Sequence, residues 1–536
     1  MKPSLSSQPR CLRALRALRA AALVLAYAAT AVAGAKTLRM GNQGDVTSMD
    51  PHSLQESFQL SFLANVYEPL VTRGRDFGLE PALALRWKQT DPTTWRFELR
   101  RGVRFHDGSP FGADDVVFTW QRTRAESSDT KLYAAPIKEV RKIDDYTVDF
   151  VTQQPYPILP DLITGWLMMS KHWCEQHGAQ QPMDVRKKQD NYATLNANGT
   201  GPFMLKSRQP GVRTVLVANP GWWGKPEHNL SEVVFTPVGN DATRVAALVS
   251  GELDVMEPVP LQDIERVRQQ PQLKVMQAPE LRTIYLGLDV FRDELLHSSV
   301  KGRNPLKDKR VRQALYQAID IEAIRTKLMR GAAHPAGMLL APGVRGYDKE
   351  LDKRLPYSVD AARKLLAEAG YGDGFEIGMQ CPNDRYVNDV EICQAVAAMW
   401  GRAGVKVQLT AESKALYFPK ALRREVTVYM LGWQPAANDG QNTLWALLDT
   451  PQPGGQGQFN LGRYSNPKLD ELTQRIGVET DAAKRQQMMR EAWTLVNADI
   501  PVLPLHDQML AWGVKRDIDL VQQPDNSMPL RYVQMK

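Results

Sequence analysis

The sequence lacks the short motifs that mark common catalytic and nucleotide-binding sites. No Gly-x-x-x-x-Gly-Lys-Ser/Thr run is present, so we do not expect the chain to hydrolyse ATP itself. No His-Glu-x-x-His occurs, and Gly108-Ser-Pro-Phe-Gly112 has its serine in second place, which excludes a nucleophile elbow. His172, Cys174 and His177 lie close together without a second ligand pair. We therefore expect no enzyme activity, no cofactor and no metal.

Long apolar runs are also missing, since no stretch reaches the roughly 18 residues of a membrane span. Residues 1–19 carry five Lys or Arg and no acid, residues 20–33 are apolar, and Ala31-Val32-Ala33 offers a small-x-small cleavage site. This pattern predicts a secretory signal peptide over 1–33 and a location in the periplasm. Cys11 precedes the apolar run, so we expect a free soluble protein rather than a lipid-anchored one.

A strong charge of one sign is absent from the predicted mature protein. The whole chain has a formal charge of +7, and removing the five positive charges of the signal peptide leaves +2. Without a strongly basic surface, nucleic-acid binding loses its main support.

Cysteine is scarce, with three residues left after the signal peptide: Cys174, Cys381 and Cys393. In an oxidising compartment, Cys381 and Cys393 can form a local disulfide and leave Cys174 unpaired. Three reduced, buried cysteines are the alternative.

The remaining composition is typical of a soluble globular protein. Of the 536 residues, 43% are hydrophobic and 24% are charged, and no internal repeat or low-complexity run interrupts them. The length predicts about three domains or lobes.

The second half alternates helices and strands, which favours an α/β architecture. A helix is expected over 358–370, with Ser358 as its N-cap and Gly370 as its C-terminal stop. A strand at 375–380, a helix at 389–402 and a strand at 405–409 follow.

The most distinctive stretch, residues 101–122, has the pattern of a strand, a turn and the start of a helix. Asp107-Gly108 is a strong turn signal. Asp114 and Asp115 fall in the first helical turn, where carboxylates suit the exposed N–H groups. Nothing here indicates catalysis, so the stretch is interpreted as packed scaffold.

This stretch carries a resemblance to a known family. Gly102-Val-Arg-Phe-His-Asp-Gly-Ser-Pro-Phe-Gly-Ala-Asp-Asp-Val-Val-Phe118 resembles the signature of family 5 extracellular solute-binding proteins. Tyr67-Glu-Pro-Leu70, Gly199-Thr-Gly-Pro-Phe203 and Tyr464-Ser-Asn-Pro-Lys-Leu-Asp470 match the family in the same order. These proteins are the dipeptide, oligopeptide and nickel receptors of bacterial ABC importers, and the resemblance runs from about 36 to 530.

The resemblance implies a two-lobed α/β fold of the type II periplasmic-binding-protein kind, with a ligand cleft between the lobes. We expect lobe I at 34–283 with an extra subdomain at about 83–205, lobe II at 284–505, and a return to lobe I at 506–536. The crossings would be the strands at 284–289 and 501–506. Closure of the lobes about a hinge would trap the solute.

Two stretches of lobe II hold the candidate ligand-binding residues. Arg385 follows a strand, where α/β sheets tend to bind ligands, and can grip a carboxylate with two hydrogen bonds. In the family, the matching arginine of the dipeptide receptor holds the peptide's C-terminal carboxylate. A surface arginine or an ion pair between the lobes is the alternative.

The second stretch is Gly432-Trp433-Gln-Pro-Ala-Ala-Asn438-Asp439. Peptide-binding relatives place an aspartate three residues after this tryptophan, and it pairs with the peptide's α-ammonium. Here that position is Ala436, so either Asp439 takes the role or the solute has no usual free α-amine, because a buried unpaired ammonium is costly. Trp433 and Asn438 would contact the solute, and Tyr417 is a weaker candidate for the cleft wall.

The sequence therefore predicts a monomeric periplasmic receptor that delivers a small polar solute to an inner-membrane ABC permease and its ATPase. A di- or oligopeptide or peptide-like compound is the leading solute. An opine-like conjugate, a metal chelate, an exported hydrolase, or a sensory or chaperone role are the alternatives.

Overall fold

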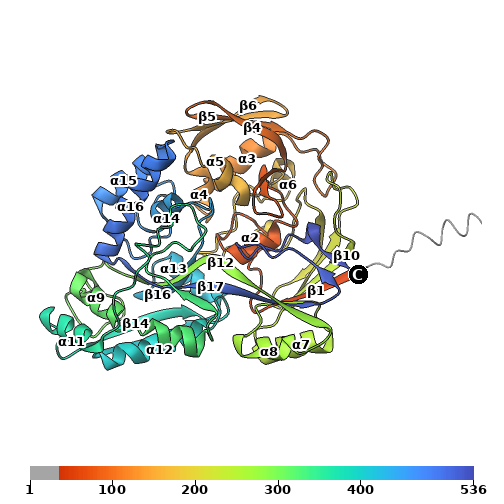
Figure 1. Cartoon of the computed structure of the whole chain (residues 1–536). Helices are drawn as coiled ribbons and strands as arrows, with labels where there is room; N and C mark the ends of the chain where they lie inside the picture. Colours follow the sequence, from red (N-terminus) through yellow and green to blue (C-terminus); the bar gives the residue numbers. More distant parts are fainter. Residues whose placement is uncertain (1–35) are drawn as a thin grey trace, which may run out of the picture.

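The computed structural model describes residues 36–536, and the predicted signal peptide lies outside them. Its largest sheet has the strand order β15-β14-β16-β12-β17-β11-β1-β10-β9-β8, with β13 also paired to β17. Strands β12 (Leu273–Leu288) and β17 (Val502–Lys515) are antiparallel neighbours in the middle of this order. Figure 1 shows these two long strands running from one half of the molecule to the other.

The first half is built on the strands that follow β17 in this order. These are β11 (Val255–Glu257), β1 (Lys36–Asn42), β10 (Leu230–Pro237), β9 (Arg213–Ala218) and β8 (Phe203–Gln209). The helices of this half are α2 (Ser57–Leu63), α7 (Asp241–Ser250) and α8 (Ile264–Arg268). Leu38 and Val233, side by side on β1 and β10, have no exposed surface, so the parallel pair forms the core of this half.

A second sheet with the order β4-β5-β7-β6 lies at the top of Figure 1. Its strands are β4 (Ala84–Asp91), β5 (Thr94–Leu99), β7 (Thr147–Thr152) and β6 (Ile137–Asp144), and a small hairpin joins β2 (Val71–Arg73) to β3 (Leu79–Pro81). The helices here are α3 (Ala113–Thr123), α4 (Lys131–Ala134), α5 (Leu159–Leu162) and α6 (Lys171–Gln176). As the sequence indicated, Gly108 takes a positive φ in the turn, and Asp115 accepts a hydrogen bond from the Gly112 N–H (3.0 Å) at the start of α3.

The second half contains β13 (Ala333–Pro335), β14 (Phe375–Pro382), β15 (Val405–Glu412) and β16 (Val428–Trp433). Its helices are α9 (Lys309–Gln317), α10 (Ile321–Ala323), α11 (Val359–Glu368), α12 (Asp389–Arg402), α13 (Lys414–Leu422), α14 (Gly440–Leu447), α15 (Pro467–Val478) and α16 (Ala482–Asp499). The short pair β18 (Ile518–Asp519) and β19 (Gln534–Met535) completes the chain. The predicted caps of α11 are confirmed, because Ser358 Oγ accepts from the Ala361 N–H (3.1 Å) and Gly370 has a φ of +83°.

The crossing strands are longer than the sequence indicated. The strand expected at 284–289 is the end of β12, which begins at Leu273, and the crossing expected at 501–506 continues to Lys515. The added parts pair with each other beyond a register shift between Pro279 and Thr283. The predicted lobe boundary after 283 thus falls within a strand, and the domain limits stay a prediction.

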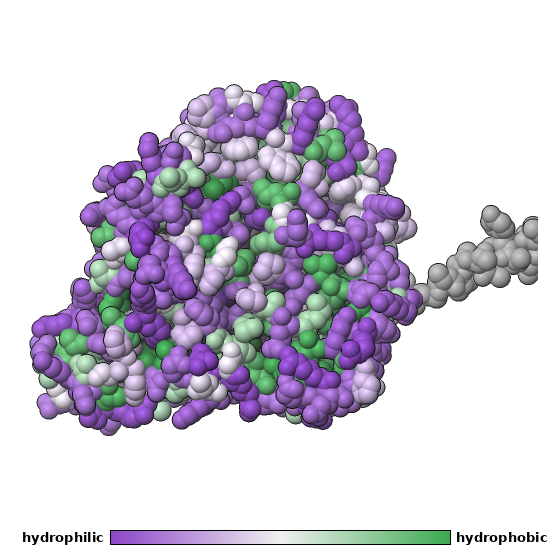
Figure 2. All heavy atoms as spheres, in the orientation of Figure 1, coloured by the Kyte–Doolittle hydropathy of each residue, from purple (hydrophilic) through white to green (hydrophobic). Residues whose placement is uncertain are grey.

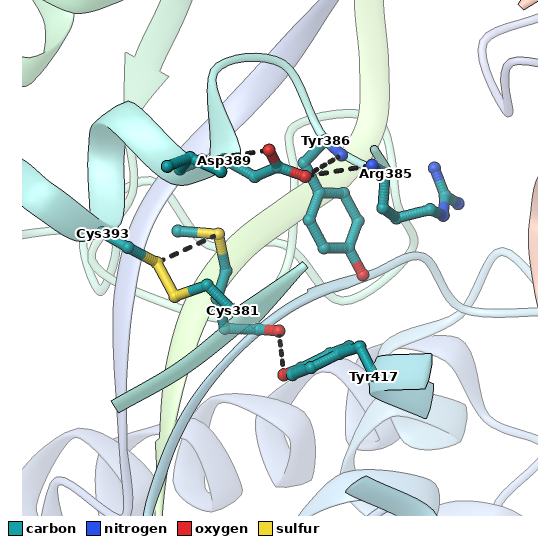
Figure 3. The surroundings of a disulfide bond; sticks show 8 residues. Cys381, Arg385, Tyr386, Asp389, Cys393 and Tyr417 are labelled. Carbon is teal, nitrogen blue, oxygen red and sulfur yellow. Dashed lines mark hydrogen bonds between the residues drawn. A yellow bond between two sulfur atoms is a disulfide. The ribbon is translucent and has the colours of Figure 1, made fainter. Parts of the chain in front are cut away.

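A disulfide joins Cys381 at the end of β14 to Cys393 in α12, and Cys174 is free and buried. Of the two alternatives for the cysteines, the structure therefore has the local disulfide. Figure 3 shows the bond beside the loop that carries Arg385, whose guanidinium points away from it. Because the bond links the strand before the loop to the helix after it, it limits the movement of this loop.

None of the helices within residues 36–536 combines the length and apolar character needed to cross a membrane. On the face drawn in Figure 2, apolar residues form separate groups among predominantly hydrophilic ones.

Candidate functional site

A cavity of about 260 Å³ lies between the two halves. The first half contributes polar residues to its wall, among them Glu56, Ser57, Glu68, Arg73 and Asp129. The second half contributes Arg385, Phe418, Leu431, Trp433, Ala436, Asn438 and Phe459, and the crossing strand β12 contributes Arg282. The volume is just below the roughly 300–1,000 Å³ typical of small-molecule sites.

Arg385 is held over the cavity by the loop between β14 and α12. The Asp389 carboxylate accepts from the backbone N–H groups of Arg385 and Tyr386, both at 3.0 Å, which fixes the loop where α12 begins. The guanidinium lies 2.7 Å from the carboxylate of Glu56 in the first half and donates to Ser57 Oγ at 2.9 Å. This pair therefore bridges the two halves.

Glu56 remains ionised although it is buried. Burial alone would raise the pKa of its carboxyl, but Arg385, Lys414 at 3.4 Å, and the backbone N–H groups of Phe58 and Gln59 lower it to about 2. Glu56 also caps α2 through those two N–H groups. Its negative charge thus stands permanently beside the arginine that was predicted to hold a solute carboxylate.

A second guanidinium, that of Arg282, lies on the same wall. It donates to Glu280 (2.7 Å), Ser57 (2.7 Å) and Gln434 (3.3 Å). Sequence reasoning missed Arg282. The available signal was a charged residue two positions before the apolar stretch 284–288, which was interpreted as a crossing between the lobes.

Trp433 and Asn438 also line the cavity, as does Ala436. The indole of Trp433 packs against Phe459 with ring centroids 5.3 Å apart, and Asn438 occupies the left-handed region at φ +49°. The wall has no acid at position 436. Solute binding by Arg385, Trp433 and Asn438 stays a prediction that their placement permits.

Asp439 and Tyr417 are not among the residues that line the cavity. Asp439 is fully buried, caps α14 through the Gln441 N–H (3.0 Å), and accepts two hydrogen bonds from Arg485 (2.7 and 2.8 Å). Tyr417 is buried and donates to the Met430 carbonyl (2.7 Å). In this structure, then, Asp439 does not supply the acid missing at Ala436, because its carboxylate is taken by Arg485.

Glu68 is a further buried acid on the wall that sequence reasoning treated only as part of a motif. It accepts from Trp222 (3.0 Å), Trp223 (2.8 Å) and Thr200 (2.8 Å). Burial raises its pKa, which these three donors partly offset, to about 7. The two indoles of the turn at 219–224 are therefore structural partners of this acid.

The ionisable groups on the wall all have protein partners. The acids are Glu56, Glu68, Asp129 and Asp525, and the guanidiniums are Arg73, Arg282, Arg385 and Arg531. Arg73, for example, pairs with Asp161 (3.0 Å), and Asp129 pairs with Arg186 (2.7 Å). The cavity thus presents charged groups that have protein partners, together with apolar side chains from both halves.

Two halves joined by two long crossing strands, with a solute-sized cavity between them, define the class of two-lobed binding proteins. Residues 78–455 match the family model described as bacterial extracellular solute-binding proteins, family 5 middle. The chain belongs to this family, whose members are solute-binding proteins of ABC transporters and not enzymes.

Known proteins are similar to this chain over nearly its whole length. The dipeptide-binding protein of Escherichia coli K12 is 28% identical over 92% of this chain and 94% of its own. The Helicobacter pylori periplasmic binding protein DppA, solved with the peptide STSA, has a TM-score of 0.82 at 22% identity, covering 94% of this chain and 98% of its own. The A. tumefaciens R10 protein AgaA, solved with agropinic acid, has a TM-score of 0.83 at 19% identity, covering 94% and 99%. These two structures support the fold alone.

Proposed function

We propose that this chain is the periplasmic substrate-binding component of an ABC importer and binds a di- or oligopeptide or a peptide-like compound. It closes on the solute as a monomer and delivers it to an inner-membrane permease, whose ATPase supplies the energy. The observation that carries the proposal is the cavity of about 260 Å³ between the two halves, whose wall includes the guanidiniums of Arg282 and Arg385.

The contacts across the cleft support a closing mechanism. Arg385 pairs with Glu56 (2.7 Å), and Arg345 of the second half pairs with Asp161 of the first (3.0 Å). Such pairs can form only when the halves approach each other, so they add to the free energy of closure around a solute.

Arg385 and Arg282 are the proposed partners of an anionic group on the solute. They converge on one hydroxyl, because both donate to Ser57 Oγ, at 2.9 and 2.7 Å. A solute carboxylate at this point would share the two guanidiniums with Glu56 and Glu280. Its recognition would therefore depend on the geometry of the hydrogen bonds as well as on the positive charge.

The part of the wall that would face the other end of the solute favours a non-peptide ligand. Ala436 stands on the wall where the family resemblance implies an acid in peptide receptors, and Asp439 is engaged by Arg485 (2.7 Å). A free α-ammonium would lack a counter-charge here. An opine-like conjugate or another compound without a free α-amine is therefore the second candidate, followed by a metal chelate.

Native mass spectrometry of the mature protein, purified without unfolding, tests both candidates. A series of added masses that match short peptides supports the peptide, whereas one non-peptide mass supports the alternative. Trp433→Ala should lose the bound mass, and Tyr417→Phe, outside the cavity, should keep it. Deletion of the gene should abolish uptake of the recovered solute, and unchanged uptake would contradict a role in import.

A further inference from the structure

Three neighbouring strands bring a histidine, an aspartate and a threonine into line beside the crossing. His334 on β13 stands opposite Asp507 on β17, and Asp507 stands opposite Thr283 on β12. Cross-strand partners project to the same face of a sheet. As a result, His334 Nδ1 lies 3.4 Å from Asp507 Oδ2, and Thr283 Oγ1 donates to Asp507 Oδ1 at 2.6 Å.

Asp352 completes the group from a turn that packs over these strands. Its Oδ1 accepts from the Gly337 N–H (2.6 Å) and the Met338 N–H (3.2 Å), and its Oδ2 accepts from Tyr347 Oη (2.9 Å). One donor atom from each of His334, Asp352 and Asp507 lies within 4.8 Å of the others. The three side chains therefore surround one point, and these hydrogen bonds hold the Asp352 carboxylate in place.

One carboxylate oxygen in this group has no ion-pair partner among the described residues except the His334 imidazole. Asp507 is 5% exposed, and its Oδ2, which faces His334, is buried without a hydrogen bond. Within residues 36–536, the His334 imidazole is the one ion-pair partner of Asp507, and no Lys or Arg pairs with Asp507 or Asp352. Two carboxylates held this close without a Lys or Arg between them repel each other, and a buried oxygen without a hydrogen bond costs free energy.

We propose that His334, Asp352 and Asp507 form a binding site for a divalent transition-metal ion, with Zn²⁺ as the best match. One imidazole and two carboxylates are a ligand set that suits zinc, whereas calcium and magnesium prefer oxygen ligands alone. Three protein ligands leave a fourth tetrahedral position for water. The side chain of His334 is 59% exposed, so an ion can reach the site from solvent.

The hydrogen bonds to the two carboxylates have the arrangement of an outer ligand shell. Thr283 orients Asp507 and leaves Oδ2 free, while Tyr347 and two backbone N–H groups orient Asp352. Such outer partners set both the direction and the basicity of the ligands.

The site is separate from the solute cavity, since none of its three ligands lines that cavity. A bound ion would connect β13 and the turn at 348–352 to β17, next to the point where β12 shifts register. It would therefore stabilise the second half at the crossing, whether or not a solute is bound.

The test is calorimetric titration of zinc chloride into the mature protein, purified without a histidine tag and treated with EDTA. We expect one equivalent to bind and to raise the melting temperature. His334→Ala, at an exposed position that does not endanger folding, should weaken zinc binding by about 100-fold or more, and Thr283→Val, which removes an outer partner, by about 10-fold.

Two controls make the result specific. His172→Ala removes an exposed imidazole elsewhere and should leave zinc binding unchanged. Trp433→Ala should also retain it, which separates this site from a chelate held in the solute cavity. Absence of stoichiometric binding at about 100 μM zinc, which is well above the dissociation constant of about 1 μM that corresponds to roughly 8 kcal/mol, or equal affinity in His334→Ala, would overturn the proposal.

Discussion

Replacement of Arg385 by alanine provides the most direct test of how the cleft recognises its solute. The Arg385 side chain is 9% exposed and that of Glu56 is 3% exposed, so the substitution removes a desolvated charge pair that bridges the halves. Truncating one partner of such a pair costs about 2–5 kcal/mol. We therefore expect Arg385→Ala to weaken solute affinity by roughly 30-fold to several thousand-fold, measured by calorimetry with the solute recovered from the protein.

Glu56→Gln separates the two ways in which Arg385 can act. If the guanidinium holds a solute carboxylate, this variant frees Arg385 from its competitor, and affinity should fall little or rise. If Arg385 acts by closing the cleft, both single variants should lose similar affinity, and the double variant should lose little more, because they remove the same contact. Affinity within twofold of the unaltered protein in Arg385→Ala would refute both roles.

Three further predictions concern stability. Burial raises the pKa of Glu257 to about 8, above its unfolded value near 4.5, so its contribution is fully present below pH 4.5 and is lost as pH rises through 8. Glu257→Gln should remove this loss, an upper limit of roughly 5 kcal/mol; identical pH profiles of denaturant unfolding would contradict the pKa. Arg485→Met leaves the buried carboxylate of Asp439 with Arg345 at 3.4 Å as its remaining cation, so it should lower the unfolding free energy by about 3 kcal/mol, and no change would argue against a buried pair. Cys393→Ser opens the disulfide with Cys381, whose partners are 12 residues apart, and should cost about 3 kcal/mol in the chain-entropy model; a midpoint insensitive to reductant in the unaltered protein would show that the bond does not stabilise it.

Local features of the fold were predictable from the sequence because they depend on residues close together in the chain. The cap of α11 by Ser358, its end at Gly370 and the turn at Gly108 follow from side-chain hydrogen bonding and positive φ. The full length of β12 was not predictable, since Pro279 and the polar residues around it break the apolar pattern. That part is a strand because β17 pairs with it from more than 200 positions away.

The candidate site likewise contains residues that the sequence could identify and contacts that depend on the fold. Arg385, Trp433 and Asn438 follow or end strands at the edge where such sheets bind ligands, so the sequence was sufficient to nominate them. Asp439 was nominated on sequence proximity to Ala436, but its partner Arg485 comes from a helix 46 residues further on. Proximity in the chain carries no information about such a partner.

By itself, then, the sequence determined the family and the order of helices and strands. Both depend on local patterns, namely short motifs, hydrophobic periodicity, caps and turns. Only the tertiary structure decided which charges meet. In the folded chain, Glu56 pairs with Arg385 across the cleft, Asp439 pairs with Arg485, and His334 lies beside Asp507. The physical reason is that electrostatic contacts depend on distance and burial, and both are set by the packing of segments far apart in the chain.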